Sequence, residues 1–265
     1  MVAMRRTVLL MAVLLACGLA AYAQDNAIQA AKPMAKDADP SFEVAVIKVS
    51  APNDQSDGFH INGRHISIEN QTVVSMICFA YAINDSQIVS APKWFAEQHW
   101  DIDGVPDVEG EPNVNQYQRM VEKLLATRFG VKMHHDKREL SGYTLMIAKA
   151  GPKLAKSKSD PDAGMDENGW GQGSQRYMAF TNSNMSDLTL CLQVAAGKPI
   201  INATNIEGRY DFTLHWTPNE ARATEPNAAP GLFTAIQEEL GLKLEATRGP
   251  TDVLVIDAAT QPTQN

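Results

Sequence analysis

The chain has 265 residues, 23 of them basic and 31 acidic, for a formal net charge of −8. This acidic balance argues against binding to a nucleic-acid backbone, which requires clustered Lys and Arg. With 44% hydrophobic residues, the chain is long enough to bury one large or two small cores.

The first 23 residues have the pattern of a signal peptide. Arg5 and Arg6 precede an apolar run, Val8 to Ala16, and small residues follow up to Ala23. This order is typical of a cleaved export signal, and the run is shorter than the ~20 residues that span a bilayer. We predict cleavage after Ala23 and export to the periplasm or the medium. Lipid attachment at Cys17, which follows a small residue, is the alternative. No later stretch approaches the length of a transmembrane span.

Residues 24–40 are rich in Ala, Lys and Asp without apolar periodicity, which predicts a flexible leader. Residues 41–150 then alternate between strand and helix patterns. We expect, in order, a strand at 42–49, a hairpin about Gly63, a helix at 73–82, short strands at 88–89 and 100–103, a helix at 117–129 ending at Gly130, and a hairpin of 131–135 and 143–148 around Leu140, Ser141 and Gly142.

Residues 151–176 are polar and contain several glycines, which predicts a mobile loop. Residues 177–265 then repeat the order of the first half. The segments that correspond are Ile66–Ile68 with Met178–Phe180, Val73–Ala82 with Met185–Ala195, Trp100–Ile102 with Tyr210–Phe212, and Gly130–Met133 with Gly241–Leu244. We therefore predict an α+β fold with internally duplicated β-α-β-β-α-β-β halves, their helices packed on small mixed or antiparallel sheets.

The duplication places Cys78 and Cys191 on the first helix of their respective halves. An oxidising compartment could join them in a disulfide. The alternative, which the pattern favours, is that both are small buried residues of a helix. Two thiols without a nearby partner make no metal cage, so we expect neither a metal ion nor another cofactor.

Three side chains are candidates for acid-base chemistry. Asp101 and Asp211 hold matching positions in the two halves, and His134 is the first of two adjacent histidines. A structural role is favoured for both aspartates, since an Asp in such a strand commonly caps a turn or pairs with an arginine such as Arg209. Adjacent histidines on a strand point to opposite faces, so His134 and His135 do not readily share a metal ion.

Trp170 lies in the polar loop, where the sequence offers it no burial partner. It is therefore the candidate for contact with a ligand or partner. A serine hydrolase is disfavoured, because Gly171–Gln175 lacks the second glycine of a nucleophile elbow and follows no predicted strand.

Several spaced motifs follow one another along the chain: Phe42-Glu43-Val44, Trp100-Asp101-Ile102, Leu124-Leu125-Ala126, Gly151-Pro152-Lys153-Leu154, Gly208-Arg209-Tyr210-Asp211-Phe212 and Leu254-Val255-Ile256-Asp257. In this order they resemble the soil-associated protein family of the Acidobacteria, a domain of unknown function. This resemblance implies an exported protein without assigned catalytic residues. The second half is also weakly similar to the short N-terminal domains of secretins and TonB-dependent receptors.

The sequence thus favours a non-enzymatic binding or interaction module of the cell envelope or secretome. We expect its partner to be an envelope protein or a small ligand, and not a nucleic acid. The alternative is an exported hydrolase, in which Asp101, His134 and Asp211 would converge on a site between the two halves.

Overall fold

The computed structural model describes residues 32–52, 56–160, 166–172, 175–218 and 228–263, with the backbone alone for 166–172. The predicted signal peptide, the cleavage site and most of the predicted leader lie outside these residues. No helix in the described part of the chain is long and apolar enough to cross a membrane.

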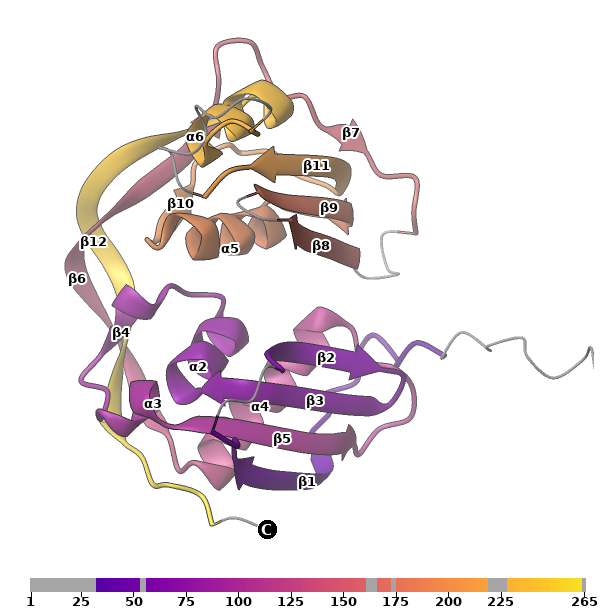
Figure 1. Ribbon diagram of the computed structural model, residues 1–265, viewed down its shortest axis with the longest axis vertical. Coiled ribbons are helices and arrows are strands. Elements are labelled where there is room, and N and C mark those ends of the chain that lie inside the picture. The colour runs from indigo at the N-terminus through magenta and orange to yellow at the C-terminus, as the bar shows by residue number, and fades with distance from the viewer. Residues whose placement is uncertain (1–31, 53–55, 161–165, 173–174, 219–227, 264–265) are drawn as a thin grey trace, which may run out of the picture. The chain divides into compact units, whose positions relative to one another are not determined.

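The first sheet is antiparallel, with strand order β1-β5-β3-β2 (Figure 1). In β1, alternation buries Ala45 and Ile47 and leaves Val44 and Val46 exposed on the other face. Helices α2 and α4 pack on the buried face. The elements of the first half are β1 (Phe42–Val49), β2 (Gly58–Asn62), β3 (His65–Thr72), α2 (Val73–Tyr81), η1 (Asp85–Gln87), β4 (Ile88–Val89), α3 (Trp94–Glu97), β5 (His99–Pro106), α4 (Val114–Arg128) and β6 (Lys132–Ile147).

The second sheet has the strand order β7-β11-β9-β8, so that each strand takes the place of its counterpart in the first sheet. α5 follows β9 as α2 follows β3, and α6 continues into the π-helical turn η3 as the counterpart of α4. The predicted α+β duplication is thereby confirmed. The elements are β7 (Ala155–Lys156), β8 (Asp166–Gln172), β9 (Gln175–Ser183), α5 (Met185–Ala196), β10 (Ile200–Asn202), β11 (Tyr210–Trp216), α6 (Leu232–Ala235), η3 (Ile236–Leu240) and β12 (Leu242–Ala258).

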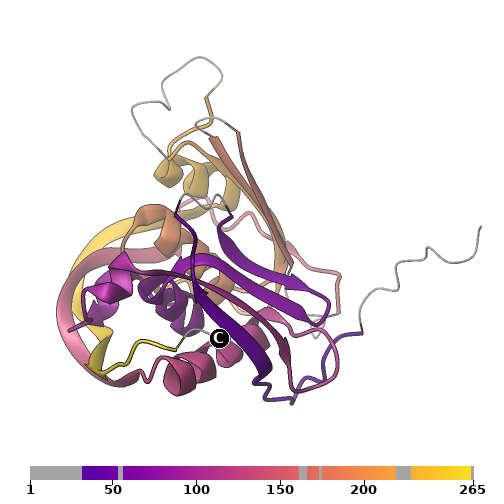
Figure 2. The same ribbon diagram turned by 60° about the horizontal axis from the view of Figure 1, so that its bottom comes forward.

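A third sheet, β10-β6-β12-β4, joins the two halves. β6 and β12 are antiparallel and pair along their lengths, from Ile147 with Leu242 to Lys132 with Ala258. Figures 1 and 2 show them as one long curved pair. β10 from the second half adds parallel to β6, and β4 from the first half adds parallel to β12.

Because of this pairing, each hydrophobic core contains a strand segment from the other half. Leu254 and Ile256 of β12 are buried in the first core, and Leu145 of β6 is buried in the second. Backbone hydrogen bonds also join the two halves: Ala148 N–H donates to Gly241 O (2.9 Å), and Thr260 N–H donates to Phe129 O (2.8 Å). Neither half is complete without the other.

The predicted hairpin around Leu140, Ser141 and Gly142 is wrong, since β6 runs through these residues without a turn. Gly142 is needed here because the backbone of Pro199 lies too close to this position of β6 to admit a side chain. A Cβ at this position would meet the carbonyl oxygen of Pro199, which accepts the N–H of Tyr143 at 2.9 Å. The glycine therefore marks the entry of β10 beside the strand.

The described residues of the predicted loop at 151–176 include β7, β8 and the start of β9. β8 pairs with β9 from Asp166 with Thr181 to Gln172 with Gln175, and β7 pairs with the start of β11. Strand pairing depends on backbone groups, so a polar edge strand carries no apolar alternation by which to recognise it.

Candidate functional site: the N-terminal strap on α4

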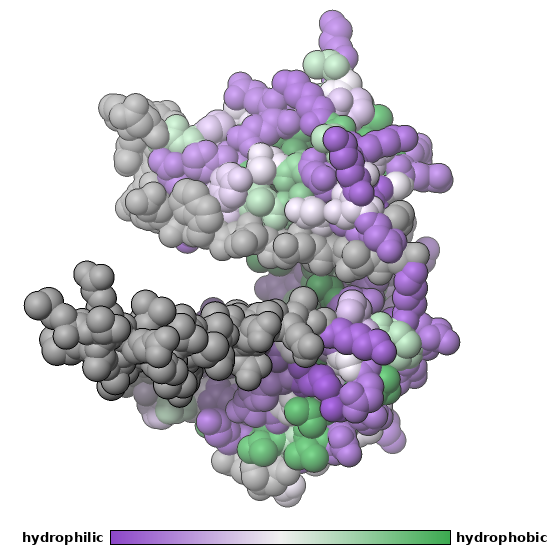
Figure 3. All heavy atoms as spheres, turned by 90° about the vertical axis from the view of Figure 1, so that its right-hand side faces the viewer, coloured by the Kyte–Doolittle hydropathy of each residue, from purple (hydrophilic) through white to green (hydrophobic). Residues whose placement is uncertain are grey.

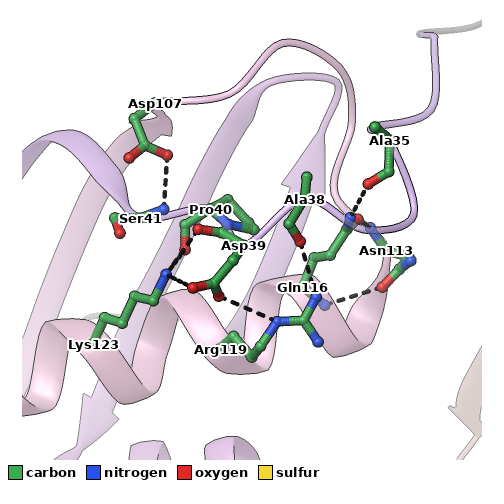
Figure 4. Close-up of polar contacts among 10 residues, drawn as sticks. All are labelled: Ala35, Ala38, Asp39, Pro40, Ser41, Asp107, Asn113, Gln116, Arg119 and Lys123. Atoms are coloured by element: carbon green, nitrogen blue, oxygen red, sulfur yellow. Dashed lines mark hydrogen bonds and ion pairs between the residues drawn. The ribbon is translucent and has the colours of Figure 1, made fainter.

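Residues Pro33–Ser41, here called the strap, lie along α4 (Figure 4). The last eight residues of the predicted flexible leader therefore have defined contacts with the folded chain. The site that holds the strap consists of the loop 107–113 and three α4 side chains, Gln116, Arg119 and Lys123, and is here called the strap site.

α4 begins with a capping box. Asn113 Oδ1 accepts the N–H of Gln116 and Gln116 Oε1 accepts the N–H of Asn113, both at 3.0 Å. The Gln116 side chain is almost fully buried, and its Nε2 donates to the carbonyl oxygen of Ala35 at 2.7 Å. One side chain therefore both caps the helix and holds the strap.

Two basic side chains further along α4 reach the next strap carbonyls. The Arg119 guanidinium donates to Ala38 O at 3.2 Å, and Lys123 Nζ donates to Asp39 O at 2.8 Å and Pro40 O at 3.0 Å. Residues 116, 119 and 123 share one face of the helix because they lie three and four positions apart. That face presents its donors in a row to the backbone of the strap.

The loop 107–113 holds both ends of the strap. Met34 N–H donates to Glu111 O (2.8 Å), and Ser41 N–H donates to Asp107 Oδ1 (2.8 Å). Met34 is 5% exposed. A Cβ on Gly110 would lie 2.6 Å from the Met34 Cα, so the loop needs glycine to admit the strap backbone.

Asp39 gives the strap a negative charge opposite the positive charges of Arg119 and Lys123 on α4. Its Oδ2 lies 2.8 Å from Lys123 Nζ, and its Oδ1 lies 3.5 Å from Arg119 Nε. The hydrogen bond from Lys123, with the positive charges of Lys123 and Arg119, holds the pKa of Asp39 below its ordinary value. Burial raises the pKa of the neighbouring Glu122. An exposed ion pair contributes little energy by itself, so the backbone contacts and the buried Met34 hold the strap.

The strap site offers donors for carbonyl oxygens and, beside Gly110, a buried apolar position that Met34 fills, here called the seat. The contacts above include no nucleophile with a base. What the strap site binds in this structure is a segment of the same chain, through backbone carbonyl oxygens and the buried Met34. Its sequence signals were present: Met34 and Asp39-Pro40 in the leader, and Arg119 and Lys123 one turn apart on α4. Sequence reasoning missed the site because exposed charges and a short polar leader ordinarily remain in solvent.

The two matched aspartates brace equivalent bulges. Asp101 Oδ1 accepts the N–H of Asn70 at 2.9 Å, and Asp211 Oδ1 accepts the N–H of Asn182 at 2.9 Å. Both asparagines have left-handed backbone, with φ of 52° and 55°. Ser50 Oγ also donates to Asp101 (2.6 Å). Hydrogen bonds from Asn182 N–H and the Ser157 side chain lower the pKa of Asp211. Arg209 instead donates to Asn182 O, at 2.6 Å.

His134 lies on β6 with its Nδ1 2.9 Å from Asp257 Oδ1 of β12. Both side chains are about half exposed. No group of three described His, Cys, Asp or Glu residues could hold a metal ion. Within the described residues, histidine also lies near a carboxylate at His60 with Glu69 (3.9 Å) and at His65 with Asp103 (3.4 Å).

The three acid-base candidates have separate partners. The contacts of Asp101 lie at the β3–β5 bulge, those of His134 on the β6–β12 pair, and those of Asp211 at the β9–β11 bulge. The hydrogen bonds described above join none of the three to another.

Trp170 lies on β8 opposite Tyr177 of β9, and its side chain is outside the described residues. Cys78 and Cys191 are both half-buried, on α2 and α5, and no disulfide joins them. Burial, with a smaller contribution from the charge of Asp85, raises the pKa of the Cys78 thiol to about 12.

The surface seen in Figure 3 is mostly hydrophilic, with small separate groups of hydrophobic residues. Exposed apolar side chains of the described chain are distributed over several elements, among them Val44 and Val46 on β1, Val194 on α5, Ile201 on β10 and Phe233 on α6. Scattered residues of this kind are ordinary for a soluble protein, so they do not identify a contact surface.

The fold and the strap site define a duplicated α+β domain whose N-terminal segment is bound to its own first half. Residues 74–259 match the family described as a protein of unknown function, DUF3738. Because the match covers well over half of the chain, the protein belongs to this family. No curated protein and no solved structure matches the chain.

Proposed function

We propose that the protein is an exported, non-enzymatic binding or interaction module of the cell envelope or secretome. Export is supported by the basic and apolar start of the chain, which ends in small residues at Ala23. The resemblance to soil-associated acidobacterial proteins and the weaker one to secretin and TonB-receptor domains agree with an envelope role and belong to the proposal.

One observation carries the binding role: α4 holds a nine-residue segment mainly through the backbone groups of that segment. Ala35, Ala38 and Asp39 each give a carbonyl oxygen to a side chain of α4. Binding of a segment through its main-chain groups, with a pocket for a single side chain such as Met34, is a mode that peptide-binding modules use.

The alternative, an exported hydrolase, gains no support from the geometry. Asp101 and Asp211 are each committed to the backbone of a positive-φ asparagine, and His134 contacts Asp257. A general base must instead be within hydrogen-bond reach of its substrate.

The test is a pull-down from envelope extract with the mature chain as bait. The bait is compared with its Arg119→Ala/Lys123→Ala variant and with a Lys132→Ala/Lys137→Ala control that removes two exposed lysines of β6. We expect the wild type and the control to retain the same amount of one partner. The amount that the strap-site variant retains should differ from theirs, in either direction. Equal retention by all three baits, or no retention above an unrelated acidic protein, would contradict the proposal.

A further inference from the structure

The loop 107–113 is shaped around a peptide backbone. Gly110 has φ of +105°, and a Cβ there would overlap the backbone of Pro33 and Met34. Met34 fills the seat beside it with 5% of its surface exposed, and Pro40 is buried at the other end of the strap. The seat therefore selects one apolar residue and admits a backbone next to it.

The side chains of α4 add a spacing requirement. Gln116, which is 1% exposed, holds the residue after the methionine, and Lys123 holds the Asp-Pro pair that comes five and six positions after it. Between these points the strap makes a turn closed by Ala38 N–H to Ala35 O (3.0 Å). The intervening side chains, Ala35, Lys36 and Asp37, are exposed.

From this geometry we infer that the strap site is a peptide-binding site that the chain fills with its own N-terminal segment. A partner segment with an apolar residue followed five positions later by Asp-Pro competes for the same seat. This inference rests on the proposed binding function and names the partner class, namely a protein segment of that pattern.

Because the strap competes for the strap site, a partner segment must bind the site tightly enough to displace the strap. A tethered segment acts at an effective concentration of about millimolar, so an equal peptide binds poorly while the strap is seated. Weakening the strap without altering the site should therefore reveal binding in trans.

The experiment uses the mature chain from Gln24 and a fluorescent peptide with the sequence of residues 32–42, followed by anisotropy. The strap is weakened by Met34→Ser/Asp39→Lys, and circular dichroism checks its fold. We expect this variant to bind the peptide about tenfold or more tightly than the wild type does. Asp39→Ala alone, a milder change, should show a smaller gain in the same direction.

Two further changes test the site itself. In the strap-weakened background, Gly110→Ala should abolish peptide binding, whereas Gly249→Ala, where a new Cβ would meet nothing within 4 Å, should leave it intact. Lys123→Glu is made in a Met34→Ser/Asp39→Ala background, so that the strap itself offers no charge partner; it should weaken binding of the native peptide, and a peptide with Asp39→Lys should restore binding to that variant.

A peptide that binds none of the folded variants, or that binds regardless of Gly110 and Lys123, would overturn the inference. That failure would leave the envelope pull-down unaffected. Conversely, peptide binding without any retained envelope partner would support the site and contradict the proposed function.

Discussion

At the scale of single residues, the duplication helps to tell structural polar groups from functional ones, because a polar residue that recurs at the matching position of both halves is explained by the fold. Asp101 and Asp211 recur because the β-bulge recurs, and each accepts the N–H of an asparagine with positive φ. Gln116 has no such explanation in the repeat, since its amide reaches outside the helix to Ala35. A side chain engaged beyond its own repeat is the better candidate for function.

We predict that Asp101→Ala destabilises the fold by about 1–3 kcal/mol, because it leaves the Asn70 N–H and the Ser50 hydroxyl without their acceptor. Urea unfolding followed by circular dichroism measures this free energy. Asp103→Ala, at a half-exposed position on the same strand, is the matched control and should cost much less. Equal effects at the two positions would argue against the bracing role.

Asp211→Asn should change the pH dependence of stability. The pKa of Asp211 is lower in the folded protein than the ordinary 3.8, so the folded state binds fewer protons than the unfolded state between the two values. The stabilisation is fully present above pH 3.8 and is lost as the pH falls through the lower, folded pKa. The stability gap between wild type and variant should therefore close in acid, and a gap that widens there would contradict this account.

Cys78 should be an unreactive thiol. Its pKa of about 12 keeps it protonated at neutral pH, and the thiolate is the reactive form. In a Cys191→Ser mature chain, we expect slow reaction with a disulfide reagent at pH 8 and fast reaction after unfolding in urea. Fast labelling of the folded protein would show that the thiol is accessible and ionised.

At the scale of elements, the pair β6 and β12 shows how a turn signal can mislead. Ser141-Gly142 would suit a hairpin, but here it lets the Pro199 carbonyl approach β6 and places β10. The strap is a similar case, because a segment without periodicity is ordered by the helix beneath it.

We predict that Gly142→Ala destabilises the protein by ~1–3 kcal/mol, since the new methyl group would displace the start of β10. Thermal unfolding compares it with Gly249→Ala on β12, where the added Cβ has open space. A variant as stable as this control would mean that β10 adjusts without cost.

At the scale of the whole molecule, the two cores depend on each other through the exchanged strands. Leu254 and Ile256 complete the first core although they lie near the end of the chain, and Leu145 completes the second. Removing a buried leucine of this kind costs ~2–5 kcal/mol, and a fragment would lack several such residues at once.

The fragment 33–150 should therefore not fold alone, even though it contains the whole first sheet and both of its main helices. Amide proton shifts in a two-dimensional NMR spectrum would be poorly dispersed, whereas those of the full mature chain would be well dispersed. A cooperative, well-dispersed fragment would show that the first core does without β12.

The sequence by itself determined the local elements and their repetition. The helices α2, α4 and α5, the strand β1 and the β2–β3 hairpin follow from apolar spacing and from turn residues such as Gly63, and the matched positions of Asp101 and Asp211 follow from the repeat. These are short-range properties, in which period and capping residues act within a few positions of each other. The pairing partners were not determined in this way.

Only the tertiary structure decided which strand completes which core, that Ser141-Gly142 continues a strand, and that Pro33–Ser41 is bound. Each of these depends on groups far apart in the chain: Pro199 beside Gly142, Leu254 in the first core, and Lys123 on the carbonyl of Asp39. Backbone hydrogen bonds carry no sequence signature, because every residue except proline offers the same donor and acceptor. Most hydrogen bonds of the strap site have a backbone group of the strap as one partner, and so the site became visible only once the chain was folded.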